Sequence, residues 1–362
     1  MIPRRVFAGL LGAGLILPVM PGLAQDRAGA PVFAPVRPGR PLSFPADHGA
    51  HPDFRTEWWY VTGWLQAQGQ PIGFQITFFR IRTGADTRNP SAFAPTQVIF
   101  AHAAISDPAV GRLLHAQRIA RAGFGLAQAK VGDMDLVLDD WRLRRTASGV
   151  LQASAGDQAF ALDLSLAPTQ PPLLQGEQGF SRKGPRPDQS SYYYSLPHLK
   201  VSGALTREGR RIPVTGEAWM DQEWSSTLLD ARAVGWDWTG INLDDGGALT
   251  AFQVRDQQGQ AVWAGGSLRG ADGRLTTFGP GDVRFVTRRQ WTSPRTGARY
   301  PIARDIQART PAGPRVWRLE PLFDDQELDS RPVGPVYWEG AVKTDSGRGY
   351  LELTGYDTPL AL

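Results

Sequence analysis

An all-β fold of antiparallel strands that close into barrels is the architecture that the sequence predicts, and three observations predict it. Short segments rich in aromatic and β-branched residues alternate with clusters of Gly, Pro, Asp and Asn at a spacing of roughly 8–12 residues. No stretch of about 15 residues has the apolar periodicity of an amphipathic helix. Consecutive segments joined by short turns indicate up-and-down sheets, which hide their edges by closing on themselves.

The predicted strands of the first half are separated by polar turns. A Gln/Gly/Pro turn joins the first two, a polar loop precedes the third, and two aspartates separate the last two. The segments are residues 60–65, 72–82, 97–105, 134–138 and 141–145. Residues 168–188 form a Pro-, Gly- and Gln-rich loop that carries Lys183, and this composition fits either a functional loop or a surface excursion.

The second half contains a clearer meander of hairpins, because Asp/Gly turns connect its segments. The predicted strands are residues 235–243, 248–255 and 261–268, followed later by 337–343 and 349–356. A length of 362 residues indicates two domains.

Residues 1–24 have the features of an export signal. Arg4 and Arg5 precede an apolar run over residues 6–19, and Gly22-Leu23-Ala24 is typical of a signal-peptidase site. The two arginines indicate the twin-arginine route, with an ordinary secretory signal or an uncleaved anchor as alternatives. We therefore expect a periplasmic or secreted protein, since no later stretch reaches the roughly 18 apolar residues of a membrane span.

The composition excludes several classes of function. The absence of cysteine removes disulfides, thiolate metal sites and cysteine nucleophiles. The net charge falls from +4 to +2 when Arg4 and Arg5 leave with the signal, and the remaining basic residues are scattered, so nucleic acid is not an expected partner. The sequence also lacks the motifs of serine hydrolases, zinc proteases, dinucleotide-binding folds and P-loops.

The stretch 216–224 is unusual for a β-strand, because it contains two carboxylates. Alternation along a strand places Trp219, Asp221 and Glu223 on one face, and Met220, Gln222 and Trp224 on the other. Asp and Glu are poor strand formers and cost free energy when they are buried without a partner. This stretch also lies where one domain would end, so we expect function near a domain junction.

Aromatic residues are the second strong feature. The chain has twelve tryptophans, and seven of them lie at positions 58–59, 219 and 224, 236 and 238, and 338. A large aromatic core is the simpler explanation for any single tryptophan. For the whole set we favour a cavity lined by aromatic rings that takes a long apolar ligand, for which a barrel of about eight strands has room.

Several sequence blocks resemble the AttH/CrtC-like family, the group of predicted secreted hydrolases and carotenoid 1,2-hydratases. They occur in order between residues 48 and 356 and are rich in tryptophan. The blocks are residues 57–63 (EWWYVTG), 100–103 (FAHA), 191–195 (SYYYS), 216–224 (GEAWMDQEW), 235–238 (GWDW) and 349–356 (GYLELTGY).

The resemblance implies two packed lipocalin-like β-barrels. After a signal at 1–24 and a linker at 25–43, residues 44–224 would form the first barrel and residues 225–358 the second. The characterised hydratases of the family add water across the terminal double bond of an acyclic carotenoid, whereas many members have no established reaction. A non-catalytic periplasmic lipid carrier that works with envelope ABC transporter components is the alternative, and neither interpretation calls for a cofactor.

Hydration of an alkene requires a carboxylic acid whose pKa is raised by an apolar site, and aromatic faces that stabilise the resulting cation. Asp221 or Glu223 is the candidate acid, and Glu57 is the next candidate because it opens an aromatic block. The alternative is that Asp221 and Glu223 pair with arginines at a domain interface. The candidate ligand-binding residues are Trp59, Tyr60, His102, Tyr193, Trp219, Trp224, Trp236 and Trp238.

Two polar positions complicate this interpretation. The hydratase pattern implied by the resemblance carries His where this chain has Gln222, and Gln cannot relay protons. His48 and His51 lie near Asp47 and Asp53, but they lack a clear third ligand. A solvated or capping role is therefore favoured over a metal site.

Overall fold

The strands form two antiparallel sheets, which confirms the predicted all-β fold of two lipocalin-like barrels. The computed structural model describes residues 32–85, 89, 91, 93–227, 229–332 and 334–360. These residues belong to one compact unit, Pro31–Leu362. The expected export signal at 1–24 and the first part of the expected linker lie outside the described residues. In the described part of the chain the only helix is a short 3-10 helix, η1 (Ala46–His48), and none is long and apolar enough to cross a bilayer.

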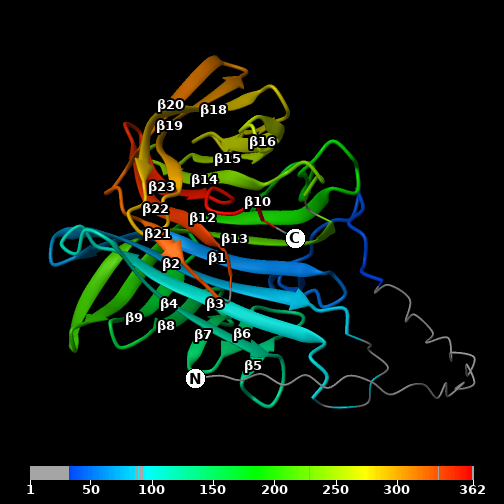
Figure 1. The fold of residues 1–362 in the computed structure, drawn as a ribbon, viewed down its shortest axis with the longest axis vertical. Helices are drawn as coiled ribbons and strands as arrows, with labels where there is room; N and C mark the ends of the chain where they lie inside the picture. The colour runs from blue at the N-terminus through cyan, green and yellow to red at the C-terminus, as the bar shows by residue number, and fades with distance from the viewer. Residues whose placement is uncertain are drawn as a thin grey trace, which may run out of the picture. The chain divides into compact units, whose positions relative to one another are not determined.

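The first sheet is built around two long central strands, β12 and β13 (Figure 1). Its order is β4 (Leu113–Arg121), β3 (Gln97–Ser106), β2 (Gln70–Arg82), β1 (Thr56–Ala67), β13 (Arg210–Thr227), β12 (Ser190–Arg207), β9 (Phe160–Ala167), β8 (Leu151–Gly156), β7 (Trp141–Arg145), β6 (Asp135–Leu138) and β5 (Ala127–Ala129). At the far end β5 returns beside β3, so the sheet curls into a nearly closed barrel.

Residues 168–188 are not the structureless loop that their composition indicates. Two short strands within them, β10 (Leu173–Leu174) and β11 (Phe180–Arg182), pair with β12. The side chain of Gln175 also joins the two halves of the chain, because it bonds to Ser195 of the first sheet and to Thr250 of the second, each at 2.9 Å.

The second sheet begins at Gly235, eight residues after β13 ends at Thr227. Its order is β17 (Leu275–Phe278), β16 (Ala261–Arg269), β15 (Ala248–Arg255), β14 (Gly235–Leu243), β23 (Gly347–Leu353), β22 (Val336–Thr344), β20 (Gly313–Pro321), β19 (Arg299–Thr310) and β18 (Val283–Thr292), with β21 (Glu327–Asp329) paired to β22. Several of these strands, β18 among them, are not predicted from the sequence. Most side chains of β18 are exposed, so the strand lacks the apolar alternation on which prediction depends.

Each barrel has its own apolar core, and a third cluster of buried side chains lies between the sheets. This third cluster includes Tyr60, Trp219, Trp238 and Tyr350. The sheets approach closely at Gly73 of β2, where a Cβ atom would lie only 2.6 Å from that of Ala341 in β22. The space between the sheets is therefore part of the packed interior.

Candidate functional site

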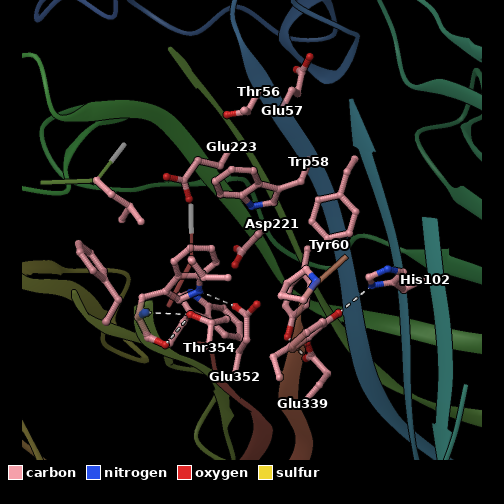
Figure 2. Close-up of a pocket in the computed structure, with 18 of the residues that line it drawn as sticks. Thr56, Glu57, Trp58, Tyr60, His102, Asp221, Glu223, Glu339, Glu352 and Thr354 are labelled. Atoms are coloured by element: carbon pink, nitrogen blue, oxygen red, sulfur yellow. Dashed lines mark hydrogen bonds between the residues drawn. The ribbon is translucent and has the colours of Figure 1, made fainter. Parts of the chain in front are cut away.

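A cavity of about 380 Å³ lies where the first sheet faces the second (Figure 2). Strands β1, β2, β3, β12 and β13 supply one wall, and β14, β15, β22 and β23 supply the other. The lining is largely aromatic, but it also contains five carboxyl groups: Glu57, Asp221, Glu223, Glu339 and Glu352.

The alternation predicted for residues 216–224 is confirmed. On β13, Asp221 and Glu223 line the cavity, and Trp219 belongs to the cluster between the sheets. Met220 and Trp224 pack into the core of the first barrel. Both faces of β13 are covered from Ala218 to Ser225, so apolar and polar residues are buried together over this part of the strand.

Three side chains donate hydrogen bonds to Asp221, which is 3% exposed. Ser195 Oγ donates to Oδ1 at 2.5 Å, Trp219 Nε1 donates to the same oxygen at 2.7 Å, and Tyr193 OH donates to Oδ2 at 2.8 Å. Trp238 Nε1 donates to the Tyr193 hydroxyl at 3.0 Å, which leaves the hydroxyl hydrogen directed at Asp221. The carboxyl group is thus fixed in position by both sheets.

Burial raises the pKa of Asp221 to about 7, and the charge of Glu223 contributes to the rise. The three hydrogen bonds act in the opposite direction, because they stabilise the ionised form. Near neutral pH the protonated and ionised forms are therefore both populated.

Glu223 has a different environment, because it is paired with a cation. Lys183 Nζ lies 3.0 Å from Glu223 Oε1, and it also lies over the rings of Tyr193 and Phe252 at 4.4 and 4.2 Å. The ion-pair alternative considered for both carboxylates thus fits Glu223, although its partner is a lysine from the 168–188 segment and not an arginine. Asp221 has no such partner among the described residues.

Two further carboxyl groups, Glu339 and Glu352, enter the cavity from the second sheet and were not identified from the sequence. They are cross-strand neighbours on β22 and β23. Tyr60 OH donates to Glu339 Oε1, and Trp236 Nε1 donates to Glu352 Oε2 at 3.0 Å. Burial, together with the charge of Glu352, raises the pKa of Glu339 well above its usual range, and burial raises the pKa of Glu352 to about 7. The signal available in the sequence was a glutamate two positions after a tyrosine in each of two predicted strands, Tyr337 with Glu339 and Tyr350 with Glu352, which places each pair on one face.

Five of the predicted ligand-binding residues line the cavity: Tyr60, His102, Tyr193, Trp236 and Trp238. The rings of Tyr60 and Trp238 meet edge to face, with centroids 5.2 Å apart. Burial, with the charge of His115, lowers the pKa of His102 to about 3, so its ring is neutral near pH 7. The site is therefore an aromatic chamber with carboxyl groups on both walls.

Three predicted ligand-binding tryptophans do not line this cavity. Trp59 and Trp224 point into the first barrel, because they occupy the alternate positions of β1 and β13. Trp219 packs between the sheets and donates to Asp221. Trp58, one residue before Trp59, lines the cavity in its place.

Comparison with known proteins agrees with this architecture. Residues 35–356 match the family model described as AttH-like. The chain belongs to the AttH-like family. A crystal structure from Nitrosomonas europaea that carries the provisional name AttH is 54% identical, covers 90% of this chain and 100% of its own, and superposes with a TM-score of 0.84.

More distant structures share the fold of this AttH-like protein. Kievitone hydratase from Nectria haematococca is 14% identical, with 90% of this chain and 96% of that one covered and a TM-score of 0.64. CghA is 12% identical, with coverages of 92% and 98% and a TM-score of 0.50. None of the curated protein sequences matches the chain.

Glu57 stands at the edge of the cavity of this AttH-like protein, but it is held in an ionic network. Arg80 Nε donates to Oε2 at 3.0 Å, and His51 Nδ1 lies 2.6 Å from Oε1. Burial alone would raise the pKa of Glu57, but the charge and hydrogen bonds of His51 and the charge of Arg80 lower it. Glu57 is therefore an ionised structural residue and a poor proton donor.

Gln222 lies on the barrel side of β13, away from the cavity. Tyr194 OH donates to its Oε1 at 2.6 Å, and its Nε2 donates to Glu57 Oε1 at 3.1 Å. The Gln that replaces the expected His thus takes part in a polar network inside the first barrel. It does not contact Asp221 through its side chain.

His51 joins carboxylates in the same network. Its Nε2 lies 2.9 Å from Asp47 Oδ1, and its ring stacks on Trp224 with centroids 3.8 Å apart. His48 Nδ1 lies 2.6 Å from Tyr194 OH. Within the described ranges, no group of three or more His, Asp or Glu side chains has an arrangement that could hold a metal ion.

Proposed function

We propose that this AttH-like protein is a hydratase that adds water to a carbon–carbon double bond of an apolar isoprenoid or polyene, with Asp221 as the proton donor. The observation that supports this proposal most strongly is the environment of Asp221: a buried carboxyl group in an aromatic cavity, without a cationic partner among the described residues. A hydratase is also found among the proteins that share the fold, although that similarity supports the fold alone.

The hydrogen bonds to Asp221 suit a general acid. Burial keeps the proton on the carboxyl group near neutral pH, which is where a donor is needed. As the proton moves to the alkene, negative charge develops on the carboxylate, and the donors from Tyr193, Ser195 and Trp219 become stronger. These interactions therefore stabilise the transition state more than the ground state.

Protonation of a trisubstituted alkene leaves a tertiary cation, which the cavity walls would stabilise. The rings of Tyr60, Tyr193 and Trp238 line the space beside Asp221. Aromatic faces attract cations most strongly where water is excluded. The Lys183 ammonium group, by contrast, is held on Glu223, so its charge is compensated.

The cavity volume limits what can be enclosed. An engineered cavity of about 150 Å³ holds one benzene molecule, so a volume of about 380 Å³ gives room for roughly 15 non-hydrogen atoms. The end of a long isoprenoid chain, or the whole of a short one, fits this space. Export to the periplasm through residues 1–24 is part of the same proposal, and its support is the sequence pattern alone.

Mass spectrometry of apolar extracts tests this function. The protein would be expressed in cells that produce an acyclic carotenoid, beside Asp221→Asn and a control, Asp188→Asn, which changes an exposed aspartate. A product heavier by one water with the wild type and the control, and absent with Asp221→Asn, is the expected result.

Unmodified carotenoid that copurifies equally with all three proteins would contradict hydration. That result would instead indicate a lipid carrier, for which envelope ABC transporter components are the expected partners. Asp221 would then be a structural residue.

A further inference from the structure

Buried carboxyl groups in this protein are usually paired with cations. Asp237 is fully buried on β14, and its two oxygens meet Arg255 Nε at 2.7 Å and Arg304 Nη1 at 3.0 Å. Glu57 is paired with Arg80 and Glu223 with Lys183. The fold therefore supplies a cation where a buried carboxylate has a structural role, as the cost of burying an unpaired charge requires.

Glu339, which is buried, departs from this pattern, and so does its half-buried cross-strand neighbour Glu352. In the described part of the chain no Lys, Arg or His lies within ion-pair distance of either side chain. Glu339 has no exposed surface, and its Oε2 atom has no hydrogen-bond partner among the residues that the structure describes. A buried oxygen without a partner requires an explanation, and a ligand or water in the cavity supplies one. Both side chains line the same cavity as Asp221, from the opposite sheet (Figure 2).

We propose that Glu339 and Glu352 are a second catalytic pair, which binds the attacking water and accepts its proton on the wall opposite Asp221. This inference rests on the proposed hydration reaction. Two neighbouring carboxyl groups share protons readily, because they cannot both ionise at low cost.

The hydrogen bonds assign separate roles to the two glutamates. Tyr60 OH donates to Glu339 Oε1, so a proton on Glu339 resides on the unpartnered Oε2 and can be donated to the water oxygen. Burial keeps Glu339 protonated. Trp236 Nε1 donates to Glu352 Oε2, which leaves Oε1 to accept a proton from water. Glu352 changes its protonation state near neutral pH, as a general base should.

Asp221 and Glu352 together account for every proton that moves in the reaction. The Asp221 O–H bond breaks as a C–H bond forms at the less substituted alkene carbon. A lone pair of the water oxygen then forms the C–O bond to the tertiary cation, and the water O–H bond breaks as its proton moves to Glu352. The product is a tertiary alcohol, and proton transfer from Glu352 back to Asp221 through water restores the starting state.

Reaction in D₂O separates the two halves of this mechanism. The probes are 6-methylhept-5-en-2-one, which is small enough for the cavity, and lycopene in detergent. Protonation by Asp221 followed by loss of a proton returns the alkene with deuterium incorporated, whereas water addition gives the alcohol. In Glu352→Gln, which keeps an acceptor for Trp236, we expect the hydration rate to fall roughly 10²–10⁴-fold while deuterium exchange continues.

Two variants serve as comparisons. Asp221→Asn should lose both exchange and hydration, and Glu320→Gln, a half-exposed glutamate on β20, should change neither. Thermal unfolding confirms that each variant is folded. The proposed catalytic pair would be overturned if Glu352→Gln hydrated the probes at the wild-type rate and with the wild-type ratio of exchange to hydration. The proposed function itself would be overturned if the wild type neither exchanged nor hydrated the probes.

Discussion

Asp221→Asn should change how the stability of the protein depends on pH. The substitution removes the ionisable group but keeps its shape and a carbonyl acceptor for Ser195 and Trp219. The new amide group can donate to the Tyr193 hydroxyl oxygen, which would then accept from it as well as from Trp238. The variant is therefore expected to fold, and the difference from the wild type reports the ionisation of Asp221.

The magnitude follows from the pKa of the carboxyl group. In the folded protein Asp221 keeps its proton up to about pH 7, whereas its ordinary pKa is 3.8. Folding therefore takes up a proton between these values, and the wild type loses stability relative to the variant as the pH rises from about 4 to about 7. At about 1.36 kcal/mol per pKa unit, the full effect is on the order of 4 kcal/mol.

Urea unfolding monitored by tryptophan fluorescence, at steps from about pH 3 to about pH 8, measures this difference. Plotted against pH, the free energies of unfolding of the two proteins should run parallel below about pH 4. Above that pH they should diverge, because the variant becomes more stable relative to the wild type. The charge of Asp221 also raises the pKa of Glu352, so its removal should increase the divergence. Parallel curves over the whole range would refute the reasoning, because Asp221 would then ionise alike in the folded and unfolded states.

Two further substitutions test the packing of the sheets and the ionic network of the first barrel. Gly73→Ala should lower the free energy of unfolding by about 1–3 kcal/mol, because the added Cβ would lie 2.6 Å from Ala341 Cβ and 2.7 Å from the Tyr350 hydroxyl. Glu57→Gln should lower it by about 3–5 kcal/mol, because Arg80, which is 2% exposed, would lose its carboxylate partner. Urea unfolding at pH 7 measures both effects.

Matched controls distinguish these mechanisms from a general effect of substitution. At Gly279 an added Cβ would come no closer than 3.5 Å to its neighbours, so Gly279→Ala should be close to neutral. Asp188 forms an exposed pair with Arg186, so Asp188→Asn should leave the unfolding midpoint unchanged. If Gly73→Ala were as stable as Gly279→Ala, the two sheets would have to move apart at little cost in free energy to make room for the added Cβ. If Glu57→Gln did not change the free energy of unfolding, the other hydrogen-bond partners of Arg80 would be sufficient to stabilise its charge.

Local patterns in the sequence were sufficient for the fold class and for one wall of the site. Strand alternation is a property of the backbone, so residues 216–224 alone placed Asp221 and Glu223 on the same face. The prediction of cavity-lining residues failed where it depended on how one strand packs against others. Alternation also applies to residues 57–60, but the sequence does not state which face of β1 meets the second sheet. Trp59 was therefore expected in the cavity that Trp58 lines.

Only the tertiary structure decided which carboxyl groups share the cavity and which are neutralised. Glu339 and Glu352 lie more than a hundred residues after Asp221 in the chain, and the packing of the second sheet brings them to the same cavity. Lys183 reaches Glu223 because β11 pairs with β12, and Arg80 reaches Glu57 because β2 pairs with β1. The alternation of side chains along a strand is a local property of the backbone, whereas burial and charge compensation depend on groups that are distant in sequence. The sequence alone therefore identified the candidate acids. It did not show that Asp221 is the one of them that lacks a cationic partner.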